Sequence, residues 1–415
     1  MMVDLDCRHQ RVLIVGGGAM ALRKVHQYLS AQAQVIVVAK KINEEFLTLP
    51  VTIIESDYDE AFLKDCFLVH AATDDASLNE QIVKDGRNKG IYCLSVTPSS
   101  SVLHSVLSYE DEYLQCALST KGAYPAFNRV FLQRLMEVYN EEYKDKLPYL
   151  KELRTYLISQ IQEKEILHEL LKTLPKQPCS FLSFLCDAIK MKQAKLLVFH
   201  GVRYPDTLTK DVFDFLQEVT LANNVPCYVA YLSQAVQTSL NEKNRLVVPF
   251  KEILTYLQLC KVDTLLYPML LQEGRFYEQI KKTNETFEIA PLPFSTLSQV
   301  QELIQCIHRA YHKEQQTLLI VYHSSESGNF ASLIKDIKVP KDTMFCCEKQ
   351  LDKLDVASCF KQVCVYSLLM LSGYHMEIDG QRIIQRLKDH DVTLVQQSCI
   401  SDPALKPLMI SKLTS

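Results

Sequence analysis

A run of three glycines between an apolar strand and a helix constrains the fold most strongly. The chain has 415 residues and only 11 glycines, so three in succession mark a turn that requires them. The apolar run Val12–Val15 precedes this turn, and a helical pattern over Ala19–Ser30 follows it. The turn itself reads Gly16-Gly17-Gly18-Ala19-Met20-Ala21. This Gly-x-Gly-x-x-Ala pattern in a strand–turn–helix context is typical of a dinucleotide-binding turn, although a purely structural turn stays open.

Short strand-like runs alternate with helical stretches through the first hundred residues, which predicts a parallel, doubly wound sheet. The expected strands are Val12–Val15, Gln34–Ala39, Val51–Glu55, Phe67–Ala72 and Ile91–Val96. The expected helices are Ala19–Ser30, Asp59–Asp65 and Leu78–Lys89. A further strand over Tyr113–Ser119 and a helical run from Pro125 to about Tyr143 come next.

A second alternating region begins at Lys195, after a Leu-, Glu- and Lys-rich helical stretch that ends near Pro175 and Pro178. Its expected strands are Leu196–Phe199, Pro226–Tyr231, Thr264–Pro268, Thr317–Tyr322, Thr343–Cys347, Gln362–Leu368 and Val392–Gln397. The fold prediction is therefore α/β: a Rossmann-like parallel-sheet domain with a helical extension, followed by a two-lobed α/β domain. The expected boundaries are 1–124, 125–188 and 189–415, with lobes of about 189–314 and 315–415.

Composition excludes several classes of function. A net charge of −4 gives no general attraction to nucleic acid or to an anionic membrane. No apolar run approaches the roughly 18 residues of a membrane span, and the first residues lack a secretory signal pattern. The fourteen cysteines are scattered without a Cys-x-x-Cys pair, which favours a reducing cytoplasm over a disulfide framework.

Three motifs in the first 126 residues resemble one family. They are Gln10–Val25 around the glycine turn, His70-Ala71-Ala72-Thr73-Asp74-Asp75-Ala76-Ser77-Leu78-Asn79, and Leu118-Ser119-Thr120-Lys121-Gly122-Ala123-Tyr124-Pro125-Ala126. In order and spacing they resemble the amino-terminal domain of siroheme synthase, a precorrin-2 dehydrogenase, over about residues 5–145. The resemblance implies a nicotinamide cofactor held by Gly16, Gly17, Gly18, Ala19, Met20, Ala21, Lys40, Thr73, Asp74 and Asp75.

The identity of that nicotinamide cofactor stays open. The acidic residue that usually recognises the ribose is missing, because the second strand ends Val37-Val38-Ala39-Lys40-Lys41. Lys40 could accept the 2′-phosphate of NADP or lie in solvent at a strand end. NAD is the expected cofactor, with NADP as the alternative.

One departure from the family concerns its chemistry. The resembling family carries an Asp-Asp pair after the fifth strand, and one aspartate is regarded as catalytic. Here the segment from Leu94 reads Leu-Ser-Val-Thr-Pro-Ser-Ser-Ser, without a carboxylate. Thr97 or Ser99 could orient a substrate but cannot act as a base at neutral pH. The dehydrogenase is either weakened or uses another proton acceptor such as His104, unless His104 is an ordinary helix residue.

Four segments of the second half stand out: His200–Thr207 after an apolar strand, Leu266–Leu270, His323–Asn329 and Leu369–Gly380. They resemble the anaerobic cobalt chelatase family, class II chelatases that act on sirohydrochlorin, over about residues 193–413. Metal insertion requires transient metal ligands and a base for two pyrrole protons, tasks that imidazole and carboxylate suit. The resemblance implies a metal site of His323, Glu348 and His375, with His323 and His375 also catalytic. Taken singly, each such residue is more often a solvated or capping residue than a metal ligand.

The two resemblances together imply oxidation of precorrin-2 to sirohydrochlorin and then insertion of Fe²⁺ or Co²⁺. They also imply small-molecule tetrapyrrole substrates and, by analogy with the first family, a homodimer through the helical section. Two alternatives stay open. Only one of the two activities survives, or the chain is a tetrapyrrole-binding protein without catalysis.

Overall fold

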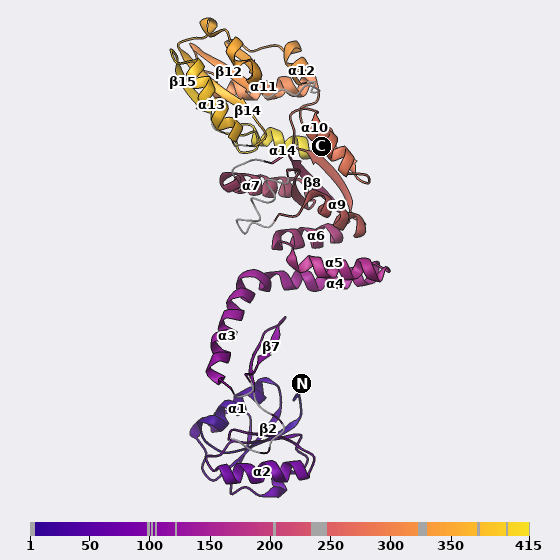
Figure 1. Ribbon diagram of the computed structural model, residues 1–415, viewed down its shortest axis with the longest axis vertical. Coiled ribbons are helices and arrows are strands. Elements are labelled where there is room, and N and C mark those ends of the chain that lie inside the picture. The colour runs from indigo at the N-terminus through magenta and orange to yellow at the C-terminus, as the bar shows by residue number, and fades with distance from the viewer. Residues whose placement is uncertain are drawn as a thin grey trace. The chain divides into compact units, whose positions relative to one another are not determined.

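The computed structural model describes residues 5–97, 100, 103, 106–120, 123–201, 205–233, 247–322, 330–371, 374–395 and 397–414. Within these ranges, residues 125, 205–209 and 374–379 are described by their backbone alone. The chain divides into two compact units, Met1–Met136 and Glu137–Ser415 (Figure 1).

The first unit contains a five-stranded parallel sheet in the order β3-β2-β1-β4-β5. Its strands are β1 (Arg11–Val15), β2 (Gln34–Ala39), β3 (Thr52–Glu55), β4 (Leu68–Ala71) and β5 (Tyr92–Ser95). Its helices are α1 (Ala19–Ser30) and α2 (Ala76–Asn88). The strand order reverses between β1 and β4, and ligands of doubly wound sheets bind at that point, beyond the carboxyl ends of the strands. The predicted doubly wound sheet is confirmed.

Apolar side chains bury both faces of this sheet, as expected for parallel strands covered by helices. One cluster includes Val12 and Ile14 with Val25 of α1, and the other includes Leu13 and Ile82 of α2. A two-stranded antiparallel hairpin of β6 (Leu107–Glu110) and β7 (Gln115–Leu118) follows, and then α3 (Pro125–Val138). The sequence predicted β7 but not β6.

The second unit contains two four-stranded parallel sheets, in the orders β11-β10-β8-β9 and β13-β12-β14-β15. The first comprises β8 (Gln193–Phe199), β9 (Cys227–Tyr231), β10 (Asp263–Pro268) and β11 (Glu288–Ile289). The second comprises β12 (Gln316–Tyr322), β13 (Thr343–Cys347), β14 (Gln362–Leu368) and β15 (Asp391–Val395). Its longer helices are α7 (Pro205–Asn223), α9 (Phe250–Leu259), α10 (Arg275–Thr283), α11 (Leu297–Tyr311), α12 (Phe330–Asp336), α13 (Tyr374–Arg386) and α14 (Lys406–Thr414).

A single buried cluster joins the two sheets of this unit. It includes Leu197 and Phe199 of β8 together with Leu318 and Ile320 of β12. The last helix, α14, packs against α7, and Nζ of Lys195 donates a hydrogen bond of 2.7 Å to the carbonyl of Leu413. The predicted α/β class of the second half is confirmed.

Three helices that precede β8 pack within the second unit. They are α4 (Leu147–Gln160), α5 (Lys164–Thr173) and α6 (Cys179–Met191). Leu153, Leu170 and Phe181 share a buried cluster with Leu196 of β8 and Tyr228 of β9. The apolar faces of these helices therefore pack on the β8 sheet.

No helix in the described part of the chain is both long enough and apolar enough to cross a membrane.

Candidate functional site

The three glycines of the turn differ in the space that a side chain would have at each position. Gly16 has a φ of +136°, and a Cβ there would lie 2.3 Å from the carbonyl oxygen of Ala72. A Cβ on Gly17 would lie 2.0 Å from the carbonyl oxygen of Lys41. A Cβ on Gly18 would meet no atom within 4 Å. The first two glycines therefore let neighbouring backbone segments approach the turn, and the third faces open space.

Helix α1 begins directly behind this open space with unsatisfied backbone donors. Gly18 occupies the N-cap and has no side chain to cap the helix, and no acidic residue stands in the first turn. The free N–H groups and the helix dipole together favour an anion such as a pyrophosphate. Ala21 is fully buried, whereas Ala19 and Met20 are exposed beside the turn. The small third position of the motif thus lets the helix pack closely on the sheet.

A second turn, after β4, faces the glycine turn across the switch point. The amide of Ala72 donates to the carbonyl of Val15, which continues the β1–β4 pairing to the end of both strands. Asp75 is the N-cap of α2, and its Oδ1 accepts hydrogen bonds from the backbone of Ser77 and Leu78. The Ser77 hydroxyl also donates a hydrogen bond of 2.6 Å to Oδ1 of Asp75. This bond makes the largest contribution to lowering the pKa of Asp75, and the two backbone bonds add to it. Asp74 is exposed at the same turn.

Asn79 connects this turn to the end of β5. Its side chain is completely buried; Oδ1 accepts from the amide (3.1 Å) and hydroxyl (2.7 Å) of Thr73. Its Nδ2 donates to the carbonyl of Thr73 (3.0 Å) and to Oγ1 of Thr97 (3.1 Å). A buried amide with four such bonds rigidly fixes the groups that it joins. Sequence reasoning gave Asn79 no role, although an asparagine three positions before Ile82, on the buried face of the helix, was a signal of a buried hydrogen-bond network.

Thr97 takes the place of the expected carboxylate, and its hydroxyl is already engaged. Besides its bond to Asn79, Thr97 Oγ1 lies 3.2 Å from Oγ of Ser95. The threonine therefore supports the backbone at the end of β5 and offers no base. Ser99, which was expected at most to orient a substrate, and His104, the alternative proton acceptor, lie outside the described residues.

Lys40 directly follows Ala39, the last residue of strand β2. Its Nζ lies 2.6 Å from Oδ1 of Asp57, and this ion pair raises the pKa of Lys40. The carboxylate comes from the loop after β3, the strand beside β2.

In the second unit, the three predicted metal ligands follow three neighbouring strands. His323 comes directly after β12 and lies outside the described residues. Glu348 comes directly after β13, and His375 is the second residue of α13, the helix after β14. Because β13, β12 and β14 are adjacent and parallel, their carboxyl ends meet at one edge of the sheet. The backbone therefore brings Glu348 and the start of α13, which contains His375, to the edge at which β12 also ends.

Glu348 is a buried carboxylate at this edge. The thiol of Cys347, also buried, donates a hydrogen bond of 3.2 Å to Oε2 of Glu348. A buried carboxylate costs desolvation free energy unless hydrogen bonds or a cation compensate for it. Among the side chains that the structure describes, no group of three His, Cys, Asp or Glu residues could hold a metal ion. The side chain of His375, like all of His323, is outside that description.

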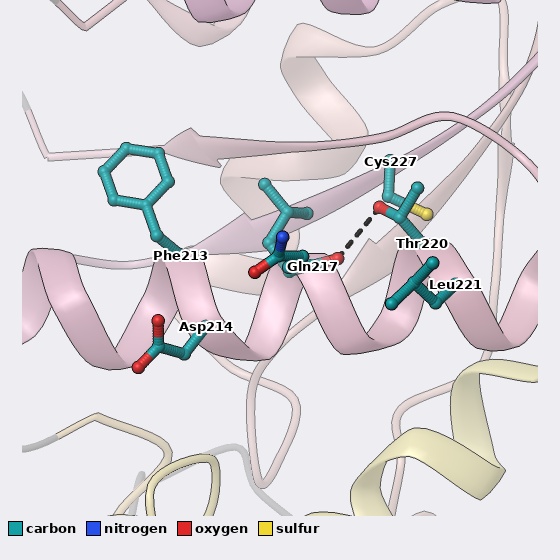
Figure 2. Close-up of a pocket in the computed structure, with 7 residues that line it drawn as sticks. Phe213, Asp214, Gln217, Thr220, Leu221 and Cys227 are labelled. Atoms are coloured by element: carbon teal, nitrogen blue, oxygen red, sulfur yellow. Dashed lines mark hydrogen bonds between the residues drawn. The ribbon is translucent and has the colours of Figure 1, made fainter.

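A hollow of about 420 Å³ lies elsewhere in the second unit (Figure 2). It is lined mainly by α7, and Figure 2 shows Phe213, Asp214 and Gln217 on that helix and Cys227 beside it. Cys227 is the first residue of β9, so the hollow lies at the amino ends of the strands. None of its lining residues belongs to β12, β13 or β14, so it is separate from the edge that carries Glu348.

Comparison with known proteins agrees with the geometry of the first unit. Residues 3–104 match a family described as putative NAD(P)-binding. Siroheme synthase of Nitrosococcus oceani is 32% identical over 154 residues, which are 34% of this chain and 31% of that protein. Siroheme synthase of Salmonella arizonae is 30% identical over 158 residues, which are 36% of this chain and 33% of that protein. The amino-terminal third of this chain is similar to siroheme synthase.

The chain spans about a third of the length of these siroheme synthases. Among solved structures, "SirC, precorrin-2 dehydrogenase" matches with a TM-score of 0.36 and 26% identity, covering 42% of this chain and 88% of that one. "SirB from Bacillus subtilis with Fe3+" matches with a TM-score of 0.37 and 16% identity, covering 54% of this chain and 94% of that one.

Proposed function

We propose that this chain carries out two successive steps of tetrapyrrole synthesis. The first unit oxidises precorrin-2 to sirohydrochlorin with NAD as hydride acceptor. The second unit inserts Fe²⁺ or Co²⁺ into sirohydrochlorin, towards sirohaem or cobalamin.

The observation that carries the first step is the glycine turn at the switch point of the sheet. Gly18 leaves open space at the uncapped start of α1, while Gly16 and Gly17 let backbone segments close around it. These residues fit a bound pyrophosphate, and the siroheme synthase relatives support a dehydrogenase rather than another nucleotide enzyme. A nicotinamide bound at this site supplies a two-electron acceptor for the hydride.

The protein's own contribution to this step is positioning. The Asn79 network holds the turn after β4 and the end of β5 in one arrangement, and both border the switch point. Hydride transfer depends mainly on the alignment of donor and acceptor, which such a rigid frame provides. Because Thr97 offers no base, the proton released in the oxidation goes to solvent or to a group outside residues 94–97.

The second step rests on Glu348 and its neighbours in the sheet. Glu348 is buried at the edge where β12 ends and where α13, which contains His375, begins; this supports a site for a divalent metal substrate. Imidazole and carboxylate ligands suit first-row divalent ions, and a neutral imidazole can also take a pyrrole proton. The three side chains would hold the ion briefly before the macrocycle receives it.

A chain that carries both steps keeps sirohydrochlorin close to its next site. The tether raises the effective concentration of the second active site around the newly made product. This advantage gives a physical reason for fusing the two units.

The residue at position 97 also favours a second candidate, a chelatase whose dehydrogenase is silent. The hydroxyl of Thr97 is committed to Asn79 and Ser95, so it supports structure where the family carries its catalytic aspartate. The first unit would then bind a dinucleotide or a tetrapyrrole without oxidising it.

An anaerobic spectroscopic assay of the purified chain separates these candidates. Precorrin-2 and NAD test the first step, and Fe²⁺ or Co²⁺ added to preformed sirohydrochlorin tests the second. Appearance of NADH, followed by loss of the free sirohydrochlorin spectrum faster than without enzyme, would establish both activities and rank the metals. Metal insertion without NADH would leave the chelatase alone, and no change in either step would indicate a binding protein.

The compartment and the oligomeric state belong to the same proposal. All fourteen cysteines are free, in line with a reducing cytoplasm.

Helix α3 exposes apolar side chains along one face, with exposed fractions of 52% at Phe127, 68% at Val130 and 49% at Phe131. Large apolar side chains gathered on one helix face mark an interaction surface, and a second copy of the chain would cover it in a homodimer.

A further inference from the structure

The end of β2 lies against the phosphate-binding turn and so determines what reaches the ribose. A Cβ on Gly17 would lie 3.0 Å from Cβ of Ala39, the last residue of β2. The amide of Asn43 donates a hydrogen bond of 3.1 Å to the carbonyl of Gly17. In dinucleotide-binding sheets the residue at this strand end, about 20 positions after the glycines, recognises the ribose 2′ position. Here the first side chain beyond the strand is the cation Lys40.

The neighbouring strand supplies the carboxylate that β2 lacks. Strand β3 runs parallel to β2 with Glu55 opposite Ala39, and the amide of Ser56 donates to the carbonyl of Ala39 (3.1 Å). This pairing carries Asp57 alongside Lys40, and their charged atoms lie 2.6 Å apart. The hydroxyl of Ser56 donates a hydrogen bond of 2.9 Å to the carbonyl of Asp57, which holds the loop in place.

Stability does not explain the ion pair. The side chains of Lys40 and Asp57 are 75% and 77% exposed, and exposed ion pairs contribute little to folding. Its location is the informative property, since a carboxylate and a 2′-phosphate would compete for the same lysine.

We propose that Asp57 is the residue that selects NAD over NADP. Its carboxylate accepts hydrogen bonds from the ribose hydroxyls of NAD, in place of the acidic residue absent from β2. It also neutralises Lys40, which would otherwise attract the additional phosphate of NADP. This inference rests on the proposed function of the first unit as a dinucleotide-dependent dehydrogenase.

Direct binding of NAD and of NADP to the full chain, by calorimetry at low ionic strength, tests the inference without any turnover. The wild-type chain should prefer NAD. Asp57→Asn keeps the side-chain volume and removes the charge, so the ratio of NADP affinity to NAD affinity should rise by roughly tenfold or more. Lys40→Gln in the Asp57→Asn background should abolish the gained NADP affinity, because the lysine is the group that receives the phosphate.

Asp65→Asn is the matched control. Asp65 is exposed and precedes β4, so it lies at the amino ends of the strands, whereas Lys40 lies at their carboxyl ends. Asp65→Asn changes the net charge as much as Asp57→Asn does. It should leave the ratio of NADP affinity to NAD affinity unchanged. Asparagine also tolerates its positive φ of 58°.

The possible outcomes separate a failure of this inference from a failure of the proposed dehydrogenase function. A wild-type chain that binds neither dinucleotide would overturn the proposed dehydrogenase and the inference together. A chain that binds a dinucleotide, but prefers NADP or gives the same ratio for Asp57→Asn as for Asp65→Asn, would overturn the inference alone. NADP affinity that persists without Lys40 would show that the lysine is not the group that Asp57 blocks.

Discussion

Gly16 and Gly18 stand two positions apart in the turn, yet substitution at each should have opposite consequences. Gly16 has a positive φ and nearly touches the backbone of Ala72. Gly18 has φ −93° and ψ −177°, an extended conformation open to any residue, at the N-cap of α1. The structural requirement and the binding requirement of the turn can therefore be separated by mutation.

Gly18→Asp should greatly weaken dinucleotide binding in a folded protein. Aspartate is a good N-cap, so the first unit should keep or gain a few tenths of a kcal/mol of stability. Its charge in the place of the pyrophosphate should weaken NAD binding by roughly 100-fold or more. Calorimetry and thermal unfolding measure the two effects.

Gly18→Asn is the uncharged control of similar size and capping ability, and it should weaken binding less than Gly18→Asp. Gly16→Ala should instead lower the free energy of unfolding by at least about 2 kcal/mol, because of strained backbone and a clash with a carbonyl. NAD affinity that is unchanged in Gly18→Asp would contradict the placement of the pyrophosphate.

His70 should make the first unit sensitive to acid. Its ring is buried in β4 and shares a hydrogen bond of 3.1 Å between Nδ1 and the hydroxyl of Tyr28. Burial, with a smaller contribution from Lys24, lowers the pKa of His70 from 6.5 to about 3. The unfolded chain therefore takes up the proton first. The stability that the neutral, buried His70 contributes is fully present above pH 6.5. It is lost as the pH falls towards 3, by roughly 3 to 5 kcal/mol in total.

His70→Gln should flatten this pH dependence, whereas His26→Gln, at an exposed position of α1, should not. Hydrogen exchange of the β1 and β4 amides between pH 4 and 7 reports on the first unit alone. Equal slopes in the two variants would rule out His70 as the source of the acid sensitivity.

At the scale of elements, the apolar face of α3 predicts self-association. Phe127 and Phe131 lie one turn apart with stacked rings 5.9 Å between centroids, and both are exposed. Phe131→Glu should convert a dimer into a monomer, because a carboxylate buried in an apolar interface costs several kcal/mol. Sedimentation over a range of micromolar concentrations measures the change.

Arg129→Ser is the control for this helix, because residue 129 lies roughly 200° around the axis from residue 131. It should leave association unchanged. A wild-type chain that sediments as a monomer at every concentration would exclude α3 as a dimer interface.

The elements themselves followed closely from the sequence. The alternation of apolar runs predicted the strands from β1 to β5 and from β12 to β15 within a few residues, because buried parallel strands are continuous apolar segments. β6 was missed because Leu107–Glu110 is a run of only four residues, and in the described part of the chain it belongs to a sheet of two strands. β11, with two residues, is too short to leave a pattern.

At the scale of the whole molecule, the two units should lose their activities independently. Glu348→Gln keeps an oxygen that can accept from the Cys347 thiol but removes the charge that attracts a divalent ion. Metal insertion should fall by at least about tenfold, while NADH formation stays unchanged. Glu314→Gln, at an exposed position before β12, is the control for loss of charge in the same unit. Full chelatase activity in Glu348→Gln would remove Glu348 from the metal site.

The sequence alone determined the fold class, the dinucleotide turn and the order of the candidate metal residues. These features are local: a glycine turn, an apolar strand and the residue that ends it are neighbours in the chain, and their chemistry does not depend on distant segments. Only the tertiary structure decided which distant segments meet. It placed Asp57 beside Lys40, joined Asn79 to Thr97, required Gly17 to be small because of Lys41, and packed α4–α6 on the sheet of the second unit. Each of these contacts depends on strand register or helix docking, which arises from burial summed over many residues and leaves no signature at the single positions involved.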